Sequence, residues 1–171
     1  MLLDYKANVN QHGGKHGSAL QAAVYEGWTD IVQLLLDNSA NVGAPGNYDS
    51  ALVLAAIIGH EDIVRVLLAN GVDINAQDET YGTALQAAAC EGYGKIVQVL
   101  LDRNADINTC SGYHGTALQA ACAEGYIDIA KLLIEKGANV FLEGGEHGTA
   151  LEAAINRGNE EIVQLIRGQM S

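Results

Sequence analysis

The chain has 171 residues, 49% of them hydrophobic, and its 21 acidic residues exceed its 9 basic residues, for a formal net charge of −12. This length suits one domain of about 100–200 residues, and the hydrophobic fraction is too high for a disordered acidic tail. Because a net negative charge repels phosphate, we expect no nucleic-acid partner and no binding to anionic membranes.

The N-terminal residues Met1-Leu2-Leu3-Asp4 lack the basic and long apolar stretches of a secretory signal. No apolar run approaches the roughly 20 residues that cross a bilayer. Cys90, Cys110 and Cys122 are an odd number without CxxC spacing, so neither a disulfide framework nor a zinc knuckle is predicted. These observations predict an intracellular protein, cytoplasmic or nuclear.

A phrase containing Ala-Leu recurs five times along the chain, at intervals of 32 or 33 residues. An Ile-Val-x-x-Leu-Leu phrase or a variant of it follows each time, and closing phrases such as Ala105-Asp-Ile-Asn108 keep the same phase. Internal repeats of this length indicate stacked units that share one core. We therefore predict a single domain over residues 1–171, in which 1–16 is the remnant of a preceding unit. The five further units are expected at residues 17–48, 49–81, 82–114, 115–147 and 148–171.

Each unit is expected to begin with a short helix. A Ser or Thr marks its start, and the side chain three residues later completes a capping box, as Gln86 does for Thr83. The second unit has Val53 there and loses half of that box. A glycine then ends the helix in the left-handed conformation. The predicted starts are Ser18, Ser50, Thr83, Thr116 and Thr149, and the glycines are Gly27, Gly59, Gly92, Gly125 and Gly158.

A second helix follows in each unit, with apolar side chains at i, i+1, i+4 and i+5, close to a helical period. An acidic residue stands in its first turn in most units, where it suits the positive end of the helix dipole. Gly71, Asn104 and Gly137 suit the end of this helix, whereas Ser39 is expected to be strained at the same place.

These phrases and their 33-residue period resemble the ankyrin repeat across essentially the whole chain. The family's Thr-Pro-Leu-His opening is here Thr-Ala-Leu-Gln or a variant, a form similar to arrays in large multidomain proteins of filamentous fungi. Gly43 and Phe141 depart from the family where its closing Asn is expected. The resemblance implies an all-α solenoid of stacked helix-turn-helix units with short β-turn loops. It also implies a non-catalytic protein–protein interaction module with a concave face formed by first helices and loop tips.

By the geometry of that family, a partner contacts the loop tips and the last turn of each first helix. A ring recurs at one tip position in every unit, and a glutamate precedes the turn glycine in three of them. Rings and carboxylates together suit a protein or peptide bearing Arg or Lys, through cation–π contacts and charge-assisted hydrogen bonds. The implied partner-binding positions are His16, Tyr25, Glu26, Tyr48, Ile57, Ile58, Glu79, Tyr81, Cys90, Glu91, Tyr113, His114, Glu124, Glu146, His147 and Arg157.

Each of these features also has a structural interpretation. The rings can stiffen the loops by packing beside a neighbouring tip, and the glutamates can form a solvated face. Ile57 and Ile58 form an apolar contact site unless one of them packs against a neighbouring helix. Trp28 and Tyr93 are expected to fill the core. The alternative function is a structural spacer or sensor segment of a larger intracellular protein. A monomer is expected, with end-to-end stacking as the alternative.

Candidate catalytic and metal-binding groups are few. Metal binding by His16, His114 and His147 is not expected, because equivalent residues of neighbouring units should lie about 8–10 Å apart, too far to share a zinc ion. Cys90 lacks the local signature of a nucleophile, and the glycines end helices rather than cradle phosphate. We expect no enzymatic activity, no cofactor and no metal.

Overall fold

The computed structural model describes residues 8–13, 15–42 and 50–170. In these residues the chain forms five pairs of short helices, and a tight turn joins the two helices of each pair. The pairs are α1 (Ala19–Tyr25) with α2 (Thr29–Asp37), α3 (Ala51–Ile58) with α4 (Glu61–Ala69), α5 (Ala84–Cys90) with α6 (Gly94–Asp102), α7 (Ala117–Glu124) with α8 (Ile127–Glu135), and α9 (Ala150–Arg157) with α10 (Glu160–Gln169). The two-residue strands β1 (Gln77–Asp78) and β2 (Gly82–Thr83) pair antiparallel between α4 and α5.

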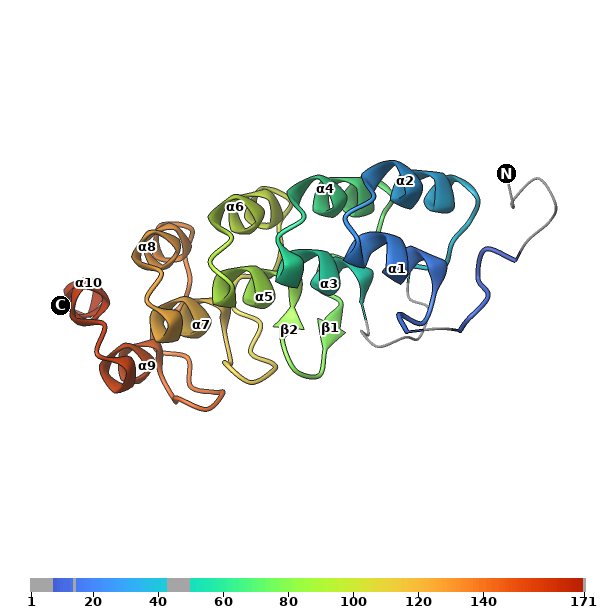
Figure 1. Ribbon diagram of the computed structural model, residues 1–171. Coiled ribbons are helices and arrows are strands. Elements are labelled where there is room, and N and C mark those ends of the chain that lie inside the picture. The colour runs from blue at the N-terminus through green and yellow to red at the C-terminus, as the bar shows by residue number, and fades with distance from the viewer. Residues whose placement is uncertain (1–7, 14, 43–49, 171) are drawn as a thin grey trace.

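The helix pairs stack side by side into an elongated, bent array. Figure 1 shows the first helices of the pairs in one row and the second helices in another, with the first helices on the inner side of the bend. The loops that precede the first helices project beyond them (Figure 1). We call their described parts tip 1 (8–17, without 14), tip 3 (75–82), tip 4 (108–115) and tip 5 (141–148). The predicted all-α solenoid of stacked helix pairs is confirmed.

The first helices begin where the sequence predicts, because side chains cap their free N–H groups. Full capping boxes join Thr83 to Gln86 in α5, Thr116 to Gln119 in α7 and Thr149 to Glu152 in α9. In α3 only half of the box forms, as expected from Val53: the Ser50 hydroxyl accepts from the N–H of Val53 at 3.5 Å.

Small residues of the first helices and branched residues of the second helices build the core. Every residue of α5 from Ala84 to Ala89 is buried, which lets α3 and α7 approach it closely on both sides. In α6 the buried residues are Ile96, Val97, Val99 and Leu100. Full burial of one such large aliphatic side chain contributes roughly 1.5–3 kcal/mol, so the core stabilises the array mainly through contacts between neighbouring pairs.

The turn glycines allow a close approach between neighbouring pairs. Gly59 has φ +84°, and a Cβ there would lie 2.5 Å from the ring of Tyr93 in the next pair. Tyr93, the residue after the turn glycine of its own pair, therefore covers the turn glycine of the preceding pair. It is still 37% exposed, so it is not simply core filler. The same arrangement recurs for His60 over Gly27, Tyr126 over Gly92 and Asn159 over Gly125.

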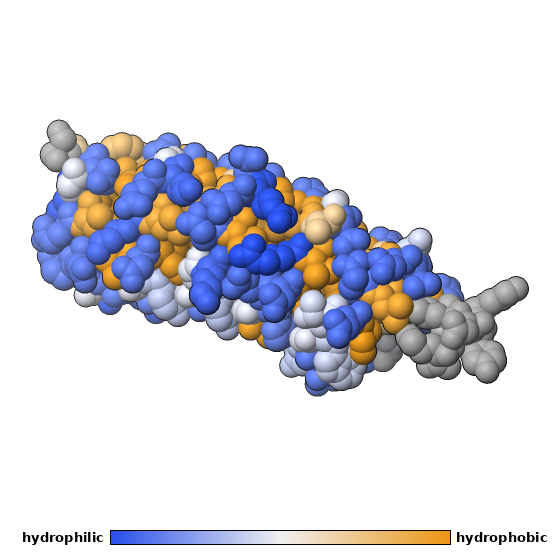
Figure 2. All heavy atoms as spheres, turned by 90° about the horizontal axis from the view of Figure 1, so that it is seen from above, coloured by the Kyte–Doolittle hydropathy of each residue, from blue (hydrophilic) through white to orange (hydrophobic). Residues whose placement is uncertain are grey.

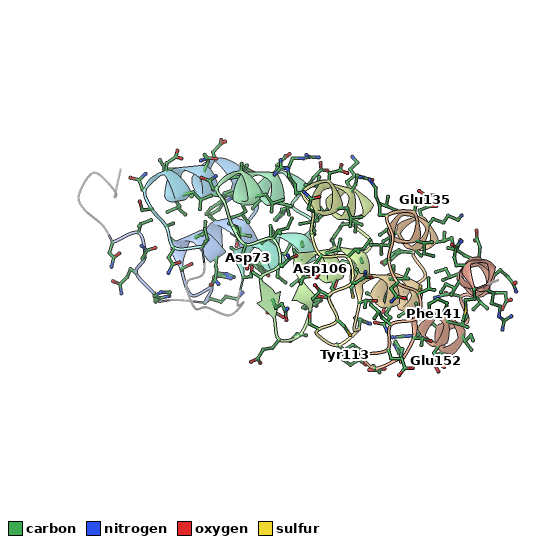
Figure 3. The ribbon with its side chains drawn as sticks, turned by 180° about the vertical axis from the view of Figure 1, so that it is seen from behind. Asp73, Asp106, Tyr113, Glu135, Phe141 and Glu152 are labelled. Carbon is green, nitrogen blue, oxygen red and sulfur yellow. The ribbon has the colours of Figure 1, made fainter. Side chains whose placement is uncertain are left out.

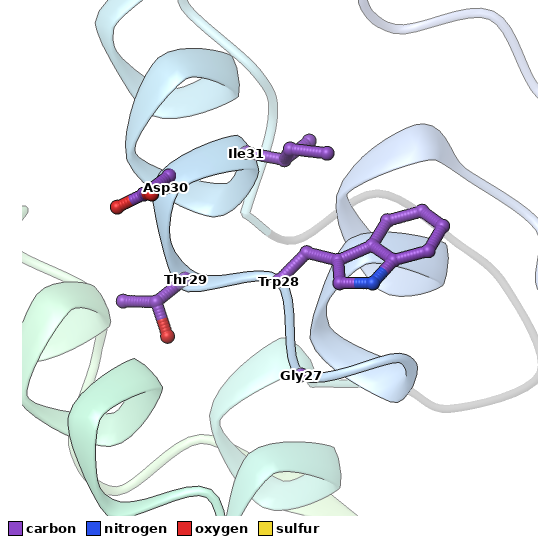
Figure 4. A pocket seen from close by; sticks show the side chains of 5 residues that line it. All are labelled: Gly27, Trp28, Thr29, Asp30 and Ile31. Atoms are coloured by element: carbon purple, nitrogen blue, oxygen red, sulfur yellow. The ribbon is translucent and has the colours of Figure 1, made fainter.

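Trp28 occupies the same position in the first described pair, and the prediction that it fills the core is wrong. It is 53% exposed, because the described chain offers it no preceding turn glycine to cover. Figure 4 shows its ring directed away from Asp30, beside a shallow hollow that Gly27 and Ile31 also line. The strain expected at Ser39 is confirmed, since this residue has φ +64°.

Candidate protein-binding surface

The tips are joined to one another through their backbones. The N–H of Tyr113 in tip 4 donates to the carbonyl of Thr80 in tip 3 at 2.9 Å, and the N–H of Glu146 in tip 5 donates to the carbonyl of Tyr113 at 2.9 Å. Within tip 4 the N–H of Ser111 donates to the carbonyl of Gly115 at 3.1 Å. Tips 3, 4 and 5 thus form one continuous ledge below the first helices.

Two glutamines fasten this ledge to the helices. Gln119 is 1% exposed; its Oε1 accepts from the N–H of Thr116, while its Nε2 donates to the carbonyls of Leu142, at 3.0 Å, and Gly148. Gln86 makes the equivalent bonds to its own cap and to tip 4. Each amide therefore caps one helix and holds the next tip. The sequence predicts the helix cap but not the bond to the next tip. The signal for that bond was a glutamine at the position where the family has histidine.

The ring-bearing residues pack in local groups. The rings of His16 and Tyr25 lie 4.5 Å apart, and Tyr113 meets His114 edge-on at 4.9 Å between centroids. His114 and His147 lie 6.3 Å apart. This is closer than the spacing of about 8–10 Å expected from packed helices, because the two side chains belong to tips on the inner side of the bend. Tyr113 remains 51% exposed and Tyr25 39% exposed.

The other predicted contact positions are more scattered. Glu79 is exposed in tip 3, and Tyr81, in the same tip, is half-buried against the core. Both Ile57 and Ile58 are half-buried and pack on the core, so they present only a small apolar area. Tyr48 lies outside the described residues.

His114 is held in a setting that favours its neutral ring. Burial lowers the pKa of His114, with His147 and Arg157 acting in the same direction and Glu124 opposing them. Two buried ring nitrogens, Nδ1 of His114 and Nε2 of His147, have no hydrogen-bond partner among the residues that the structure describes. The side chain of His147 is 9% exposed, and its Nε2 lies 3.9 Å from the carboxylate of Glu146.

Glu91 and Glu124 lie at the ends of neighbouring first helices, and Glu124 lies close enough to His114 to act on it. Burial raises the pKa of Cys90 to about 11, and the neighbouring Glu91 and Glu124 add to the effect. The carboxylate of Glu124 also lies 3.7 Å from the guanidinium of Arg157. The Cys90 thiol therefore stays protonated near neutral pH, which makes it a poor nucleophile. The structure thus brings Glu124, His114, His147 and Arg157 together, whereas Glu26 and Glu79 lie apart from them.

Most basic residues of the described chain lie away from this surface. We call the inner surface the four described tips together with the last turns of the first helices. It carries Glu26, Asp78, Glu79, Glu91, Glu124, Glu143 and Glu146, against Lys15 and Arg157. The other described basic residues belong to the second helices and their ends, namely Arg65, Lys95, Arg103, Lys131, Lys136 and Arg167.

The second helices mix the two signs of charge. Figure 2 views the molecule from their side and shows hydrophilic side chains interleaved with apolar ones. Several basic residues pair there with carboxylates, as Arg65 does with Glu61 at 2.7 Å and Lys136 with Asp102 at 3.6 Å. Figure 3 shows Tyr113 on the tip side of the molecule and Glu135 on the opposite, second-helix side.

Within the part of the chain that the structure describes, no group of three or more His, Cys, Asp or Glu side chains is placed to hold a metal ion. Over the same residues, every helix is too short or too polar to traverse a lipid bilayer.

A family model described as ankyrin repeats (3 copies) matches residues 1–78, 43–111 and 85–169. The chain belongs to the ankyrin-repeat family. A comparison with curated proteins finds no match. Ankyrin repeats are generally protein–protein interaction modules and are typically non-catalytic.

Proposed function

We propose that this ankyrin array binds a protein or peptide segment rich in Arg or Lys on its inner surface. The observation that carries the proposal is the excess of seven acidic over two basic residues on that surface, while the other six described basic residues lie on the second helices and their ends. A cationic segment meets carboxylates in tips 3 and 5 and at the ends of the first helices, and little repulsion, which favours rapid and selective association.

The exposed groups suit such a segment chemically. Tyr113 and Tyr25 each leave part of a ring accessible, which fits a guanidinium or ammonium group through cation–π contact. Glu91 and Glu124 stand on neighbouring first helices, close enough for both to act on Cys90. The pair between Arg157 and Glu124 is an internal example of a guanidinium on this row of carboxylates.

The proposal includes a soluble, intracellular monomer without cofactor or metal. All three cysteines are free, which suits a reducing compartment.

The test is a selection of random displayed peptides on the wild-type protein, followed by affinity measurements on two double variants. Glu91→Lys with Glu124→Lys should weaken the selected peptides by roughly tenfold or more, mainly through the association rate, and the loss should shrink as salt rises. Both residues lie at helix C-termini, where lysine suits the helix dipole, so the variant is expected to fold.

The matched control is Asp37→Lys with Glu135→Lys. It makes the same change in net charge at the ends of the second helices α2 and α8. Equal weakening by both double variants, or selected peptides without basic residues, would reject the inner surface as an acidic recognition site.

A further inference from the structure

A ring stands in the tight turn between the two helices of each inner pair. It belongs to the residue after the turn glycine, which is His60 between α3 and α4, Tyr93 between α5 and α6, and Tyr126 between α7 and α8. We call these three residues the turn rings. Each of their pairs has a described pair on both sides. Trp28 occupies the same place in the turn before α2 (Figure 4).

Glycines of the preceding pairs hold the turn rings in position. A Cβ on Gly59 would lie 2.5 Å from Cζ of Tyr93, and one on Gly92 would lie 2.6 Å from Cζ of Tyr126. Nevertheless Tyr93 is 37% and Tyr126 is 38% exposed. The packing therefore orders each ring and leaves part of it accessible. A side chain that is already ordered loses little entropy on binding, which favours affinity.

Hydrogen-bond donors accompany the turn rings. The hydroxyls of Tyr93 and Tyr126 have no hydrogen-bond partner in the part of the chain that the structure describes. The turn rings are also the N-cap residues of α4, α6 and α8, and no side chain caps these three helices. The first N–H of each helix donates to the carbonyl of the turn glycine. The next two N–H groups have no acceptor within the helix, so they are open to water or to a ligand.

Hollows open beside the turn rings. We call the turn rings, together with the first three residues of α4, α6 and α8, the turn edge. A hollow of about 300 Å³ at this edge is lined by Gly27, Thr29, Gly59, His60 and residues 61–63. A second one of about 360 Å³ is lined by Gly92, Gly94, Gly125, Tyr126 and residues 127–129. The turn edge thus offers a ligand both ring surface and room beside it.

The spacing of the turn rings favours one conformation of a bound chain. Equivalent residues of stacked pairs should lie about 8–10 Å apart, as packed helices do. A polyproline II helix has three residues per turn and rises about 3.1 Å per residue, so each of its edges recurs about every 9.3 Å. A β-strand returns to the same face after about 6.4–6.8 Å, and an α-helix completes a turn in about 5.4 Å. Of these three repeats, that of polyproline II matches the rings.

Charge favours a basic residue beside the prolines. The turn edge carries Glu61, Asp62 and Asp128 against Lys95. Glu61 already pairs with Arg65 at 2.7 Å, whereas Asp62 and Asp128 have no basic partner among the described residues. An Arg or Lys that accompanies the prolines therefore meets two unpaired carboxylates against one ammonium group.

We propose that the turn edge binds a proline-rich segment of a partner protein in the polyproline II conformation, with a basic residue beside the prolines. Proline rings would pack on the turn rings once per turn, since aromatic-lined grooves suit such segments. The carbonyls of a polyproline II helix make no bonds within it, so they can accept from the tyrosine hydroxyls and the open N–H groups. The turn edge contains no residue of the inner surface, and its binding does not depend on the function proposed above.

The test is an NMR titration of the isotope-labelled protein with a synthetic oligoproline peptide that ends in one arginine. We expect shift changes concentrated at residues 59–63, 92–96 and 125–129. A Gly-Ser peptide of the same length with the same arginine has equal charge and a flexible chain. It should bind roughly tenfold or more weakly, because it must be ordered on binding and brings no proline rings.

The variant that tests the rings is Tyr93→Asn with Tyr126→Asn. Asn159 occupies the equivalent position in the last described pair, where its amide donates to the carbonyl of Cys122 at 2.8 Å. Asparagine therefore suits this turn, and circular dichroism checks the fold. Loss of the two rings should weaken binding of the oligoproline peptide roughly tenfold or more.

The matched control is Tyr25→Asn with Tyr113→Asn. It removes two exposed tyrosines from the inner surface and should leave the affinity for the oligoproline peptide unchanged. The proposal is overturned if that peptide does not bind, if it binds no better than the Gly-Ser peptide, or if its shift changes fall on the tips. Equal affinity of the wild type and the variant without Tyr93 and Tyr126 would overturn it as well.

Discussion

Tips 3 and 4 have similar shapes but are held in place in different ways. Tip 4 is fastened from outside, because the buried amide of Gln86 donates to its carbonyls. Tip 3 follows α3, where Val53 offers no such donor, and it is stabilised from within. There Asp78 accepts from the N–H groups of Thr80, at 2.8 Å, and Tyr81, at 2.9 Å, between the paired strands β1 and β2.

Tips 3 and 4 therefore have similar backbone shapes although different hydrogen bonds hold them in place. Where the preceding helix supplies a glutamine, the tip position equivalent to Asp78 is Ser111 or Gly144, and the regular pairing shrinks to a single bridge. Where the preceding first helix has a valine, Val53, the tip itself supplies the acceptor, which is the carboxylate of Asp78. The stability of tip 4 therefore depends on the neighbouring helix, whereas that of tip 3 depends on its own sequence.

The largest expected effect comes from Gln119→Glu. This change would bury a carboxylate against the carbonyls of Leu142 and Gly148, so we expect a loss of about 3 kcal/mol or more in the free energy of unfolding. Urea denaturation followed by circular dichroism measures it. The reverse exchange at the exposed position, Glu152→Gln, should change stability by less than about 0.5 kcal/mol. Similar losses of unfolding free energy in the two variants would show that the Nε2 group of Gln119 does not hold tip 5 in place.

A smaller effect is expected from Asp78→Ala. Two N–H groups of tip 3 lose their acceptor, which should cost about 1–2 kcal/mol. Hydrogen exchange should accelerate at the amides of Thr80 and Tyr81 and remain unchanged in tip 5. Ser111→Ala is the matched change in tip 4 and should cost less, because Gln86 still holds that tip. An Asp78→Ala protein with unaltered exchange in tip 3 would contradict internal stabilisation.

The smallest effect concerns pH and tips 4 and 5. Burial lowers the pKa of His114 in the folded state, so the unfolded chain binds a proton at this site more readily. The stability contributed by neutral His114 is therefore complete above the unfolded pKa of about 6.5. It is lost as pH falls through that value toward the lower folded pKa. Urea midpoints at pH 7.5 and 5.5 should differ less in His114→Gln than in the wild type, and equal differences would argue against this role.

Much of the fold could be predicted because its determinants are local. The 33-residue period, the Ser or Thr that starts each first helix and the glycine that ends it are all readable as short phrases. Even the strained backbone of Ser39 could be predicted, because Ser39 occupies the position in its repeat that Gly71 and Gly137 occupy in theirs.

The contacts between units could not be read in the same way. A phrase such as Thr116-Ala-Leu-Gln119 reveals the i, i+3 bond of a cap, but not a second bond to a tip more than twenty residues away. The exposure of Trp28 could not be predicted for the same reason, because it depends on whether the turn glycine of a preceding pair lies beneath the ring. The close approach of His114 to His147 likewise depends on the bend of the whole array.

The inner surface carries seven acidic residues against two basic ones, whereas the second helices and their ends carry nine against six, so the excess of negative charge is greater at the tips. The field of a cationic partner of the kind proposed above would exert a torque on this uneven charge distribution before any atoms touch. The array would then turn its tips toward the partner during the diffusive encounter, so that a larger share of collisions begins in a productive orientation.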